Sequence, residues 1–206
     1  SVFCDHAGML WFGCSGNSLV SYNTSLKSFT RFSASGDGPY GIGIIAEDNL
    51  NNLWLVNPRE GIFVKKPARD KIEKFLEYTE LPGNKPGCNL WDFMTDGNND
   101  LWISTNYGIY RTDIDKRVVD DFTGKDGTGS RSYNWFVRIM EDDSKNILAL
   151  NSLDGLYRFE GKLGPFVKND ENYGLNGLLF HNLNADDTKR LWIFHNNTLT
   201  IAVPGT

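Results

Sequence analysis

Few side chains in this 206-residue sequence have the chemistry and spacing of a reactive site. Two of its three histidines, His181 and His195, are close enough to lie on neighbouring strands of one sheet. There they could form a metal pair, or a general base with its partner. Two histidines without a third ligand are a weak signal for either role, so ordinary loop histidines remain the simpler interpretation. We assign His6 to a turn on the opposite face.

Other candidate motifs are also weak. The segment 96–100, Asp-Gly-Asn-Asn-Asp, has some likeness to a calcium loop, but it lacks the downstream glutamate and the required spacing, which favours a turn. The three cysteines, Cys4, Cys14 and Cys88, form no CxxC pair and are interpreted as small buried apolar residues. No nucleophile elbow, phosphate-binding glycine loop or HExxH motif occurs. We therefore expect no catalytic residues, no metal and no cofactor.

The charge and hydropathy of the sequence limit the classes of partner that the chain could bind. The chain has 21 Lys and Arg against 26 Asp and Glu, for a net charge of −5, which disfavours a nucleic-acid surface. The one basic cluster, between Lys65 and Lys74, is expected to be a solvated strand edge and hairpin. No apolar run approaches the length of a membrane span, so we expect no membrane contact from this segment.

The elements that must position these residues follow from an internal repeat. An aspartate stands five residues before an apolar pair in five successive units. The pairs are Leu10-Trp11, Leu53-Trp54, Leu101-Trp102, Ile147-Leu148 and Leu191-Trp192, and the aspartates are Asp5, Asp48, Asp96, Asp142 and Asp186. The pairs are 43 to 48 residues apart, and turn-forming residues separate each aspartate from its pair. The aspartates are therefore predicted to form turns.

Each unit also contains a first apolar segment before the aspartate and further segments after the pair. The third segments begin at Ser18, Gly61, Gly108, Gly155 and Thr198, and fourth segments begin eleven residues later at Phe29, Ile72, Val119 and Phe166. Four short strands with a period near 45 residues are typical of a β-propeller blade. We predict an all-β chain, a single propeller segment over 1–206, with blades at about 1–35, 40–80, 88–125, 133–169 and 178–206. The last blade is expected to lack its outer strand.

Blade topology predicts where a ligand would bind. The first strand of a blade lies innermost, so its start should lie near the end of the second strand. This places seven residues at one end of the blades: Asn57, Arg59, Trp91, Tyr107, Trp135, His181 and His195. Aromatic rings beside amides and an arginine suit sugars or other polar, ring-shaped ligands. Trp91 and Trp135 break the repeat and could instead cover the core, whereas the four repeat tryptophans are expected to pack between blades.

The repeat resembles a known family. Residues 96–105, Asp-Gly-Asn-Asn-Asp-Leu-Trp-Ile-Ser-Thr, followed by Gly108-Ile109-Tyr110-Arg111, are similar to the two-component regulator propeller repeat, and residues 141–148 with 154–159 also match it. The resemblance extends over all five units, although Cys14, Asn57 and His195 replace the usual threonine. It implies a segment of the periplasmic sensor of a Bacteroides-type hybrid histidine kinase, in which polysaccharide breakdown products are typical signals.

These observations lead to three functional hypotheses. The first is a non-catalytic periplasmic sensor segment of a hybrid two-component regulator, responding to a glycan-derived ligand and packing against neighbouring sensor domains. The second is a propeller lyase that uses His181 or His195 as its base. The third is a scaffold for protein partners. An unfinished blade exposes a sheet edge, so a homodimer is also plausible.

Overall fold

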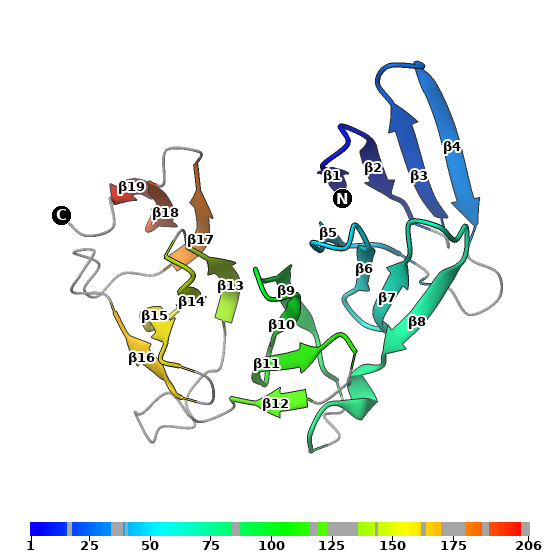
Figure 1. The fold of residues 1–206 in the computed structure, drawn as a ribbon. Coiled ribbons are helices and arrows are strands. Elements are labelled where there is room, and N and C mark those ends of the chain that lie inside the picture. Colours follow the sequence, from blue (N-terminus) through cyan, green and yellow to red (C-terminus); the bar gives the residue numbers. More distant parts are fainter. Residues whose placement is uncertain are drawn as a thin grey trace. The chain divides into compact units, whose positions relative to one another are not determined.

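The computed structural model describes residues 1–15, 18–33, 39, 41–83, 87–115, 119–122, 136–142, 144–161, 164–169, 180–186 and 190–202. These residues form five consecutive antiparallel sheets, which are the blades of a β-propeller fold (Figure 1). The chain divides into two compact units, Ser1–Leu90 and Trp91–Thr206. Each unit is described separately, and the single-propeller boundary over 1–206 stays a prediction.

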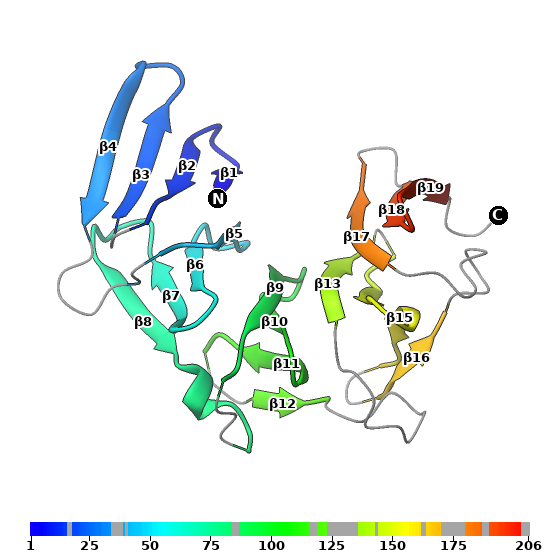
Figure 2. The ribbon, with the colours of Figure 1, turned by 180° about the vertical axis from the view of Figure 1, so that it is seen from behind.

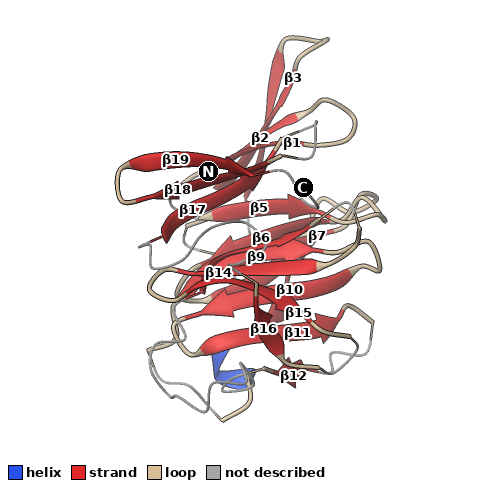
Figure 3. Cartoon of the chain, turned by 90° about the vertical axis from the view of Figure 1, so that its left-hand side faces the viewer, coloured by secondary structure: helices blue, strands red, loops and turns tan. Residues whose placement is uncertain are grey.

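The first unit contains two four-stranded blades. Blade 1 consists of β1 (Val2–Cys4), β2 (Leu10–Gly13), β3 (Ser18–Asn23) and β4 (Ser28–Ser33). Blade 2 consists of β5 (Ile44–Glu47), β6 (Leu53–Asn57), β7 (Gly61–Lys65) and β8 (Ile72–Leu76). The short 3₁₀ helix η1 (Tyr78–Glu80), blue in Figure 3, is the one helix among the described residues.

The second unit contains three blades. Blade 3 consists of β9 (Leu90–Thr95), β10 (Asp100–Thr105), β11 (Gly108–Asp113) and β12 (Val119–Asp121). Blade 4 consists of β13 (Phe136–Glu141), β14 (Ile147–Asn151), β15 (Gly155–Phe159) and β16 (Phe166–Lys168). Blade 5 consists of β17 (Phe180–Ala185), β18 (Leu191–His195) and β19 (Thr198–Ala202). The predicted strands, including the three-stranded fifth sheet, are thus confirmed in the described part of the chain.

The repeat aspartates form the turns between the first two strands, as predicted. In blade 2, Asp48 Oδ1 accepts hydrogen bonds from the amides of Leu50 and Asn52, both 2.9 Å long. The residue three positions after the aspartate has a positive φ in blades 1 to 4, where Gly8, Asn51, Asn99 and Lys145 occupy this position. Glycine and asparagine accept this left-handed conformation at low cost, which explains the turn composition of the repeat.

Neighbouring blades in each unit pack through two recurring faces. The tryptophan face carries the second residue of the apolar pair and the second residue of the third strand, which are Trp102 and Ile109 in blade 3. The aliphatic face carries the residues three before, five after and seven after the repeat aspartate, which are Ile139, Ile147 and Ala149 in blade 4. These two faces pack together in one core cluster. Burial of this apolar surface is the main force that joins the blades.

The same arrangement recurs between blades 1 and 2, where Trp11 and Leu19 pack with Ile45, Leu53 and Leu55. Between blades 4 and 5, Leu148 and Leu156 pack with Leu183, Leu191 and Ile193. The prediction that repeat tryptophans pack between blades is therefore confirmed for Trp11 and Trp102. Trp192 differs, because its face of blade 5 is not covered in the described structure.

Two predictions need correction. Cys4 is exposed and Cys14 is partly exposed, so among the cysteines only Cys88 is a buried apolar residue. In the basic cluster, Lys66, Arg69, Lys71 and Lys74 are exposed as predicted. Lys65 is the exception: it is 6% exposed, and its Nζ lies 4.9 Å from the centre of the Phe32 ring. An ammonium group over an aromatic face is attracted by the ring quadrupole. Nζ also donates to the carbonyl of Arg69 at 3.1 Å, so this lysine packs inside unit 1 although burial lowers its pKa.

Candidate functional site

Asn57, the first predicted ligand residue, has its side chain engaged in a turn. It is 8% exposed, and its Oδ1 accepts hydrogen bonds from the amides of Arg59 (2.8 Å) and Glu60 (3.0 Å). Asn151 accepts the equivalent bonds in blade 4, at 3.0 Å from Leu153 and 3.2 Å from Asp154. Asn57 and Asn151, which end the second strands of blades 2 and 4, therefore each form an Asx turn with the residues that follow.

The remaining predicted residues of the first three blades are accessible. Arg59 is exposed in the turn between β6 and β7, and Trp91, at the start of β9, is 45% exposed. Tyr107 lies partly exposed just after β10. Because the turn at 96–99 joins β9 and β10 as a hairpin, Trp91 and Tyr107 lie at the same end of blade 3. Trp135 lies outside the described residues.

The two histidines of blade 5 do not form a pair. A bulge in β17 pairs Phe180, not His181, with His195. The His181 ring lies 5.7 Å from that of Phe194, and the His195 ring lies 6.1 Å from that of Phe180. Phe194 and His195 are consecutive on β18, so these contacts are on opposite faces of the sheet. His195 is buried, and its Nε2 lies 2.6 Å from the Thr200 hydroxyl.

A polar cluster that the sequence analysis missed joins the first strands of unit 2. The Arg138 guanidinium contacts Asp92 Oδ1 at 3.2 Å on β9, and Asn182 Oδ1 at 2.8 Å and Asn184 Oδ1 at 3.3 Å on β17. Seen from behind, β13 lies between β9 and β17, which allows one side chain to reach both (Figure 2). Asp92, Arg138 and Asn182 all stand four residues before a repeat aspartate, and this repeated polar position could have revealed the cluster.

Asp92 is the buried member of this cluster. It is 5% exposed, and its Oδ2 accepts a 2.8 Å hydrogen bond from the amide of Ile139. Burial raises the pKa of this carboxyl, while the Arg138 guanidinium and the Ile139 amide oppose the increase. A buried carboxyl held by a cation and an amide is a structural link between blades 3 and 4.

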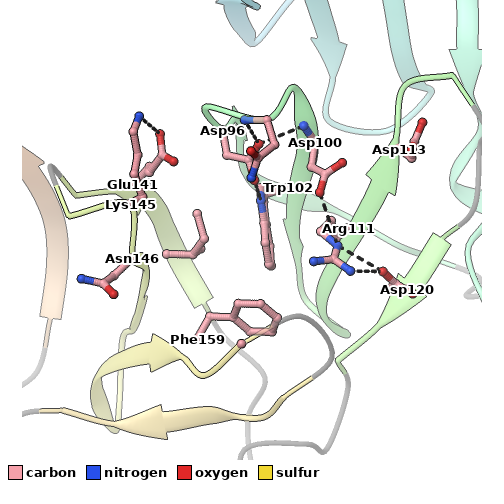
Figure 4. A pocket seen from close by; sticks show the side chains of 13 residues that line it. Asp96, Asp100, Trp102, Arg111, Asp113, Asp120, Glu141, Lys145, Asn146 and Phe159 are labelled. Carbon is pink, nitrogen blue, oxygen red and sulfur yellow. Dashed lines mark hydrogen bonds and ion pairs between the residues drawn. The ribbon is translucent and has the colours of Figure 1, made fainter.

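A pocket of about 780 Å³ lies between blades 3 and 4 of unit 2. Its wall includes the turn residues Asp96, Asn98, Lys145 and Asn146 and the strand residues Asp100, Trp102, Arg111, Asp113, Asp120, Glu141, Ile147 and Phe159 (Figure 4). The hairpin turns between first and second strands form its rim. The pocket is therefore at the end of the blades opposite Trp91 and Tyr107, and it contains none of the predicted ligand residues.

Arg111 is the central cation of this pocket. Its Nη2 contacts Asp120 Oδ2 at 2.5 Å, and its Nε lies 3.8 Å from Asp100 Oδ2. The guanidinium also lies 5.5 Å from the Trp102 ring centre and 5.9 Å from that of Phe159. Contacts with carboxylates on one side and aromatic rings on the other fix this side chain in place.

Acidic groups outnumber basic groups in the pocket wall. Five carboxyl groups, on Asp96, Asp100, Asp113, Asp120 and Glu141, face two cations, on Arg111 and Lys145. Burial and then the nearby Asp96 carboxylate raise the pKa of Asp100, while Arg111 opposes this increase. The Glu141 carboxylate already has partners within the protein. It accepts a 3.1 Å hydrogen bond from the amide of Gly97 and forms an ion pair with Lys145 at 3.2 Å.

This arrangement has the chemistry to bind a polar ligand. Carboxylate, amide and guanidinium groups at fixed positions could hydrogen-bond a hydroxyl-rich ligand, and the excess of carboxylates would repel an anion. No group of three or more His, Cys, Asp or Glu side chains that could hold a metal ion occurs among the residues that the structure describes. Those residues also include no helix that is both long and apolar enough to span a membrane.

Comparison with known proteins finds similarity to solved structures, but no protein-family model and no curated protein matches this chain. Among solved structures, the extracellular domain of the hybrid two-component system BT3049 from B. thetaiotaomicron matches 98% of this chain and 26% of its own, with a TM-score of 0.75 and 18% identity. The corresponding domain of BT4673 matches 94% and 25%, with a TM-score of 0.70 and 16% identity.

A third match is an enzyme. A catalytically inactive His-to-Ala variant of virginiamycin B lyase from Staphylococcus aureus, solved with quinupristin, matches 100% of this chain and 69% of its own. Its TM-score is 0.70 and its identity 13%. At these identities the matches show the propeller fold alone. The chain spans about a quarter of the length of the two-component system domains it matches.

Proposed function

We propose that this chain is a non-catalytic, ligand-binding propeller segment of an extracytoplasmic sensor in a hybrid two-component system. The observation that carries the proposal is the match of 98% of the chain to the extracellular domain of BT3049. The likeness of residues 96–105 to the two-component regulator repeat supports the same assignment independently. A periplasmic location follows from this assignment.

The ligand that we propose is a neutral oligosaccharide derived from a glycan. The pocket between blades 3 and 4, at about 780 Å³, is within the range of small-molecule sites. Exposed Asn98 and partly exposed Asp113 could bond to sugar hydroxyls, and Phe159 adds an apolar surface. The acidic wall would repel uronic or sulfated sugars, which gives the proposal a charge preference that can be tested.

The alternative site is the other end of blade 3. There the exposed Trp91 ring could stack on a sugar while Tyr107 donates a hydrogen bond. Arg59 belongs to the first unit, so any ligand that it binds would be separate from this site on blade 3. Of the other predicted ligand residues, Asn57 and His195 have side chains that are buried in structural roles.

The lyase hypothesis receives less support. A channel-mouth base must reach its substrate, but His195 is buried, and His181 lies against Phe194 on the other face of the sheet. A lyase reaction would therefore depend on the exposed His181 alone as the base, because the buried His195 could not assist it. We therefore favour binding without chemistry.

A thermal-shift screen against oligosaccharides tests the proposal. A neutral oligosaccharide should raise the Tm without being cleaved, because a ligand that binds only the folded state stabilises it. Asn98→Ala and Asp113→Asn should abolish this shift, and uronate oligosaccharides of the same length should produce none.

Trp91→Ala is the matched control, because it removes an exposed side chain at the opposite end of blade 3. It should leave the shift unchanged. A shift that is lost in Trp91→Ala and kept in Asn98→Ala would move the site to the other end. A panel in which no glycan binds would refute the proposed ligand.

A further inference from the structure

Neighbouring blades are also joined at the turns between their first and second strands. In unit 2 the amide of Gly97, one residue after the repeat aspartate of blade 3, donates to both carboxylate oxygens of Glu141, at 3.1 and 3.2 Å. Glu141 stands one residue before the repeat aspartate of blade 4. In unit 1 the equivalent Glu47 accepts the amide of His6 at 2.8 Å. The same two positions of the repeat thus make the same contact in both units.

The contact in unit 2 crosses the rim of the pocket between blades 3 and 4. One side of the rim is the turn of blade 3, which includes Asn98, and the other is the turn of blade 4, which includes Lys145 and Asn146. Glu141 is the last residue of β13, directly before the second turn, and it holds the first turn through the Gly97 amide (Figure 4). One carboxylate therefore connects the two sides of the rim.

A glycine at position 97 allows this close approach. The Nζ of Lys145 pairs with Glu141 Oε2 at 3.2 Å. A methyl group at position 97 would lie 2.8 Å from that Nζ and 3.3 Å from Glu141 Oε1, which is closer than ordinary van der Waals contact. The absence of a side chain at Gly97 thus lets both the carboxylate and the ammonium group lie against the turn.

The bond from the amide is the stronger of the two contacts of Glu141. The Glu141 side chain is 18% exposed, and hydrogen bonds to a charged acceptor are among the stronger ones in proteins. The Lys145 side chain is 69% exposed, and an ion pair so open to solvent stabilises little. The amide bond is therefore the contact that holds the two turns together.

We propose that Glu141 is a positioning residue for the glycan, and that its bond to Gly97 pre-organises the rim of the pocket. This inference rests on the proposed function, because it concerns the same pocket. If both turns are held in place before the glycan arrives, less conformational entropy is lost on binding. Without the bond, each turn must be ordered separately when the glycan binds, which lowers the affinity.

The test compares Glu141→Ala with Glu141→Gln in the whole chain. Both variants remove the carboxylate charge, but only glutamine keeps an oxygen that can accept the Gly97 amide. Hydrogen exchange of that amide, followed by NMR without ligand, should be roughly tenfold faster in Glu141→Ala and nearly unchanged in Glu141→Gln. Affinity for the neutral oligosaccharide that gives the largest thermal shift should fall roughly tenfold in Glu141→Ala and be largely retained in Glu141→Gln.

Glu47→Ala is the matched control, because it breaks the equivalent bond in unit 1, whereas the described pocket wall belongs to unit 2. It should speed exchange of the His6 amide and leave both the Gly97 amide and the oligosaccharide affinity unchanged. Unchanged exchange of Gly97 in Glu141→Ala would overturn the inference, and so would faster exchange with unaltered affinity. If no oligosaccharide binds the unsubstituted chain, the proposed function fails, and exchange of Gly97 alone then decides whether Glu141 holds the rim.

Discussion

The indole Nε1 of Trp102 donates a 2.9 Å hydrogen bond to Oδ2 of Asp96, six residues earlier in the chain. The same bond joins Trp11 to Asp5, Trp54 to Asp48 and Trp192 to Asp186, at 2.7 to 2.9 Å. One carboxylate thus holds both the turn and the aromatic ring on the strand that follows it. In blade 4, where Leu148 replaces tryptophan, Asn146 Nδ2 donates to Asp142 Oδ2 instead.

We expect Asp48→Ala to destabilise the first unit strongly. Asp48 is 4% exposed, and its removal leaves the amides of Leu50 and Asn52 and the Trp54 indole without this acceptor. The buried indole donor left without a partner costs about 1–3 kcal/mol, and each of the two partly buried amide bonds contributes about 0.5–1.5 kcal/mol, so the free energy of unfolding should fall by about 2 kcal/mol or more. Urea denaturation measures this, with the exposed Asp115→Ala as control. Equal stability of the two variants would refute a structural role for the repeat aspartate.

Arg138→Ala should destabilise the second unit, because it removes the cation beside buried Asp92 and the contacts to β17. We expect a loss of about 2 kcal/mol or more, since an unpaired buried carboxyl is left behind. A double-mutant cycle with Asn182→Ala separates the two sides of the cluster. Purely additive losses in that cycle would show that Arg138 does not couple to β17.

The raised pKa of Asp92 predicts a pH dependence of definite sign. Because the folded state keeps this proton to a higher pH than the unfolded state, whose Asp pKa is about 3.9, stability falls as pH rises through the folded pKa. Asp92→Asn removes this titration. The free energy of unfolding of the unsubstituted chain relative to Asp92→Asn should therefore be greatest below about pH 4 and should decrease as pH rises through the folded pKa of Asp92. A difference independent of pH would contradict the burial of an ionisable group here.

Asn57 offers a direct comparison between turn formation and ligand binding. Asn57→Ala removes the acceptor for the amides of Arg59 and Glu60 and should lower the unfolding free energy by about 1–2 kcal/mol. Asn57→Asp keeps that acceptor and should retain most of the stability. Glycan affinity, measured by calorimetry below the unfolding transition, should be the same in both. An affinity lost in both variants would return Asn57 to the ligand site.

Variants of His181 and His195 distinguish a binding function from a catalytic one. We expect His181→Ala to leave both ligand binding and stability nearly unchanged, because the ring is exposed. His195→Ala should lower stability by about 1 kcal/mol or more, since it removes a buried ring and its bond to Thr200. Incubation with a streptogramin or an oligosaccharide, followed by mass spectrometry, would reveal a lyase through product formation that His181→Ala abolishes.

The period of the repeat was sufficient to predict the described strands, because each short strand depends on local turns and alternating apolar residues. The end of the second strand was harder to interpret. An asparagine at position 57 is compatible both with a turn and with a ligand site, so the sequence alone does not distinguish the two roles. The bulge beside His181 depends on tertiary packing, which the spacing of residues in the sequence does not reveal. The partners Asp92 and Arg138 are separated by a whole repeat, so only the packing of blades brings them together.

The pocket was missed for a similar reason. Arg111 and Asp120 lie on adjacent outer strands, whereas Phe159 reaches the pocket from the next blade. The family-like motif contains Arg111, but the motif alone does not show that two hairpin turns enclose a hollow beside it.

The position of Arg138 on β13 has a mechanical consequence. A force that displaces β17 must either break its contact with the Arg138 guanidinium or move this group along with it. The same guanidinium also binds Asp92 on β9. Pulling on the last blade of unit 2 should therefore load the third blade before the fourth has unfolded. In a single-molecule stretching experiment, these three sheets should rupture as one event, and Arg138→Ala should split that event into successive steps.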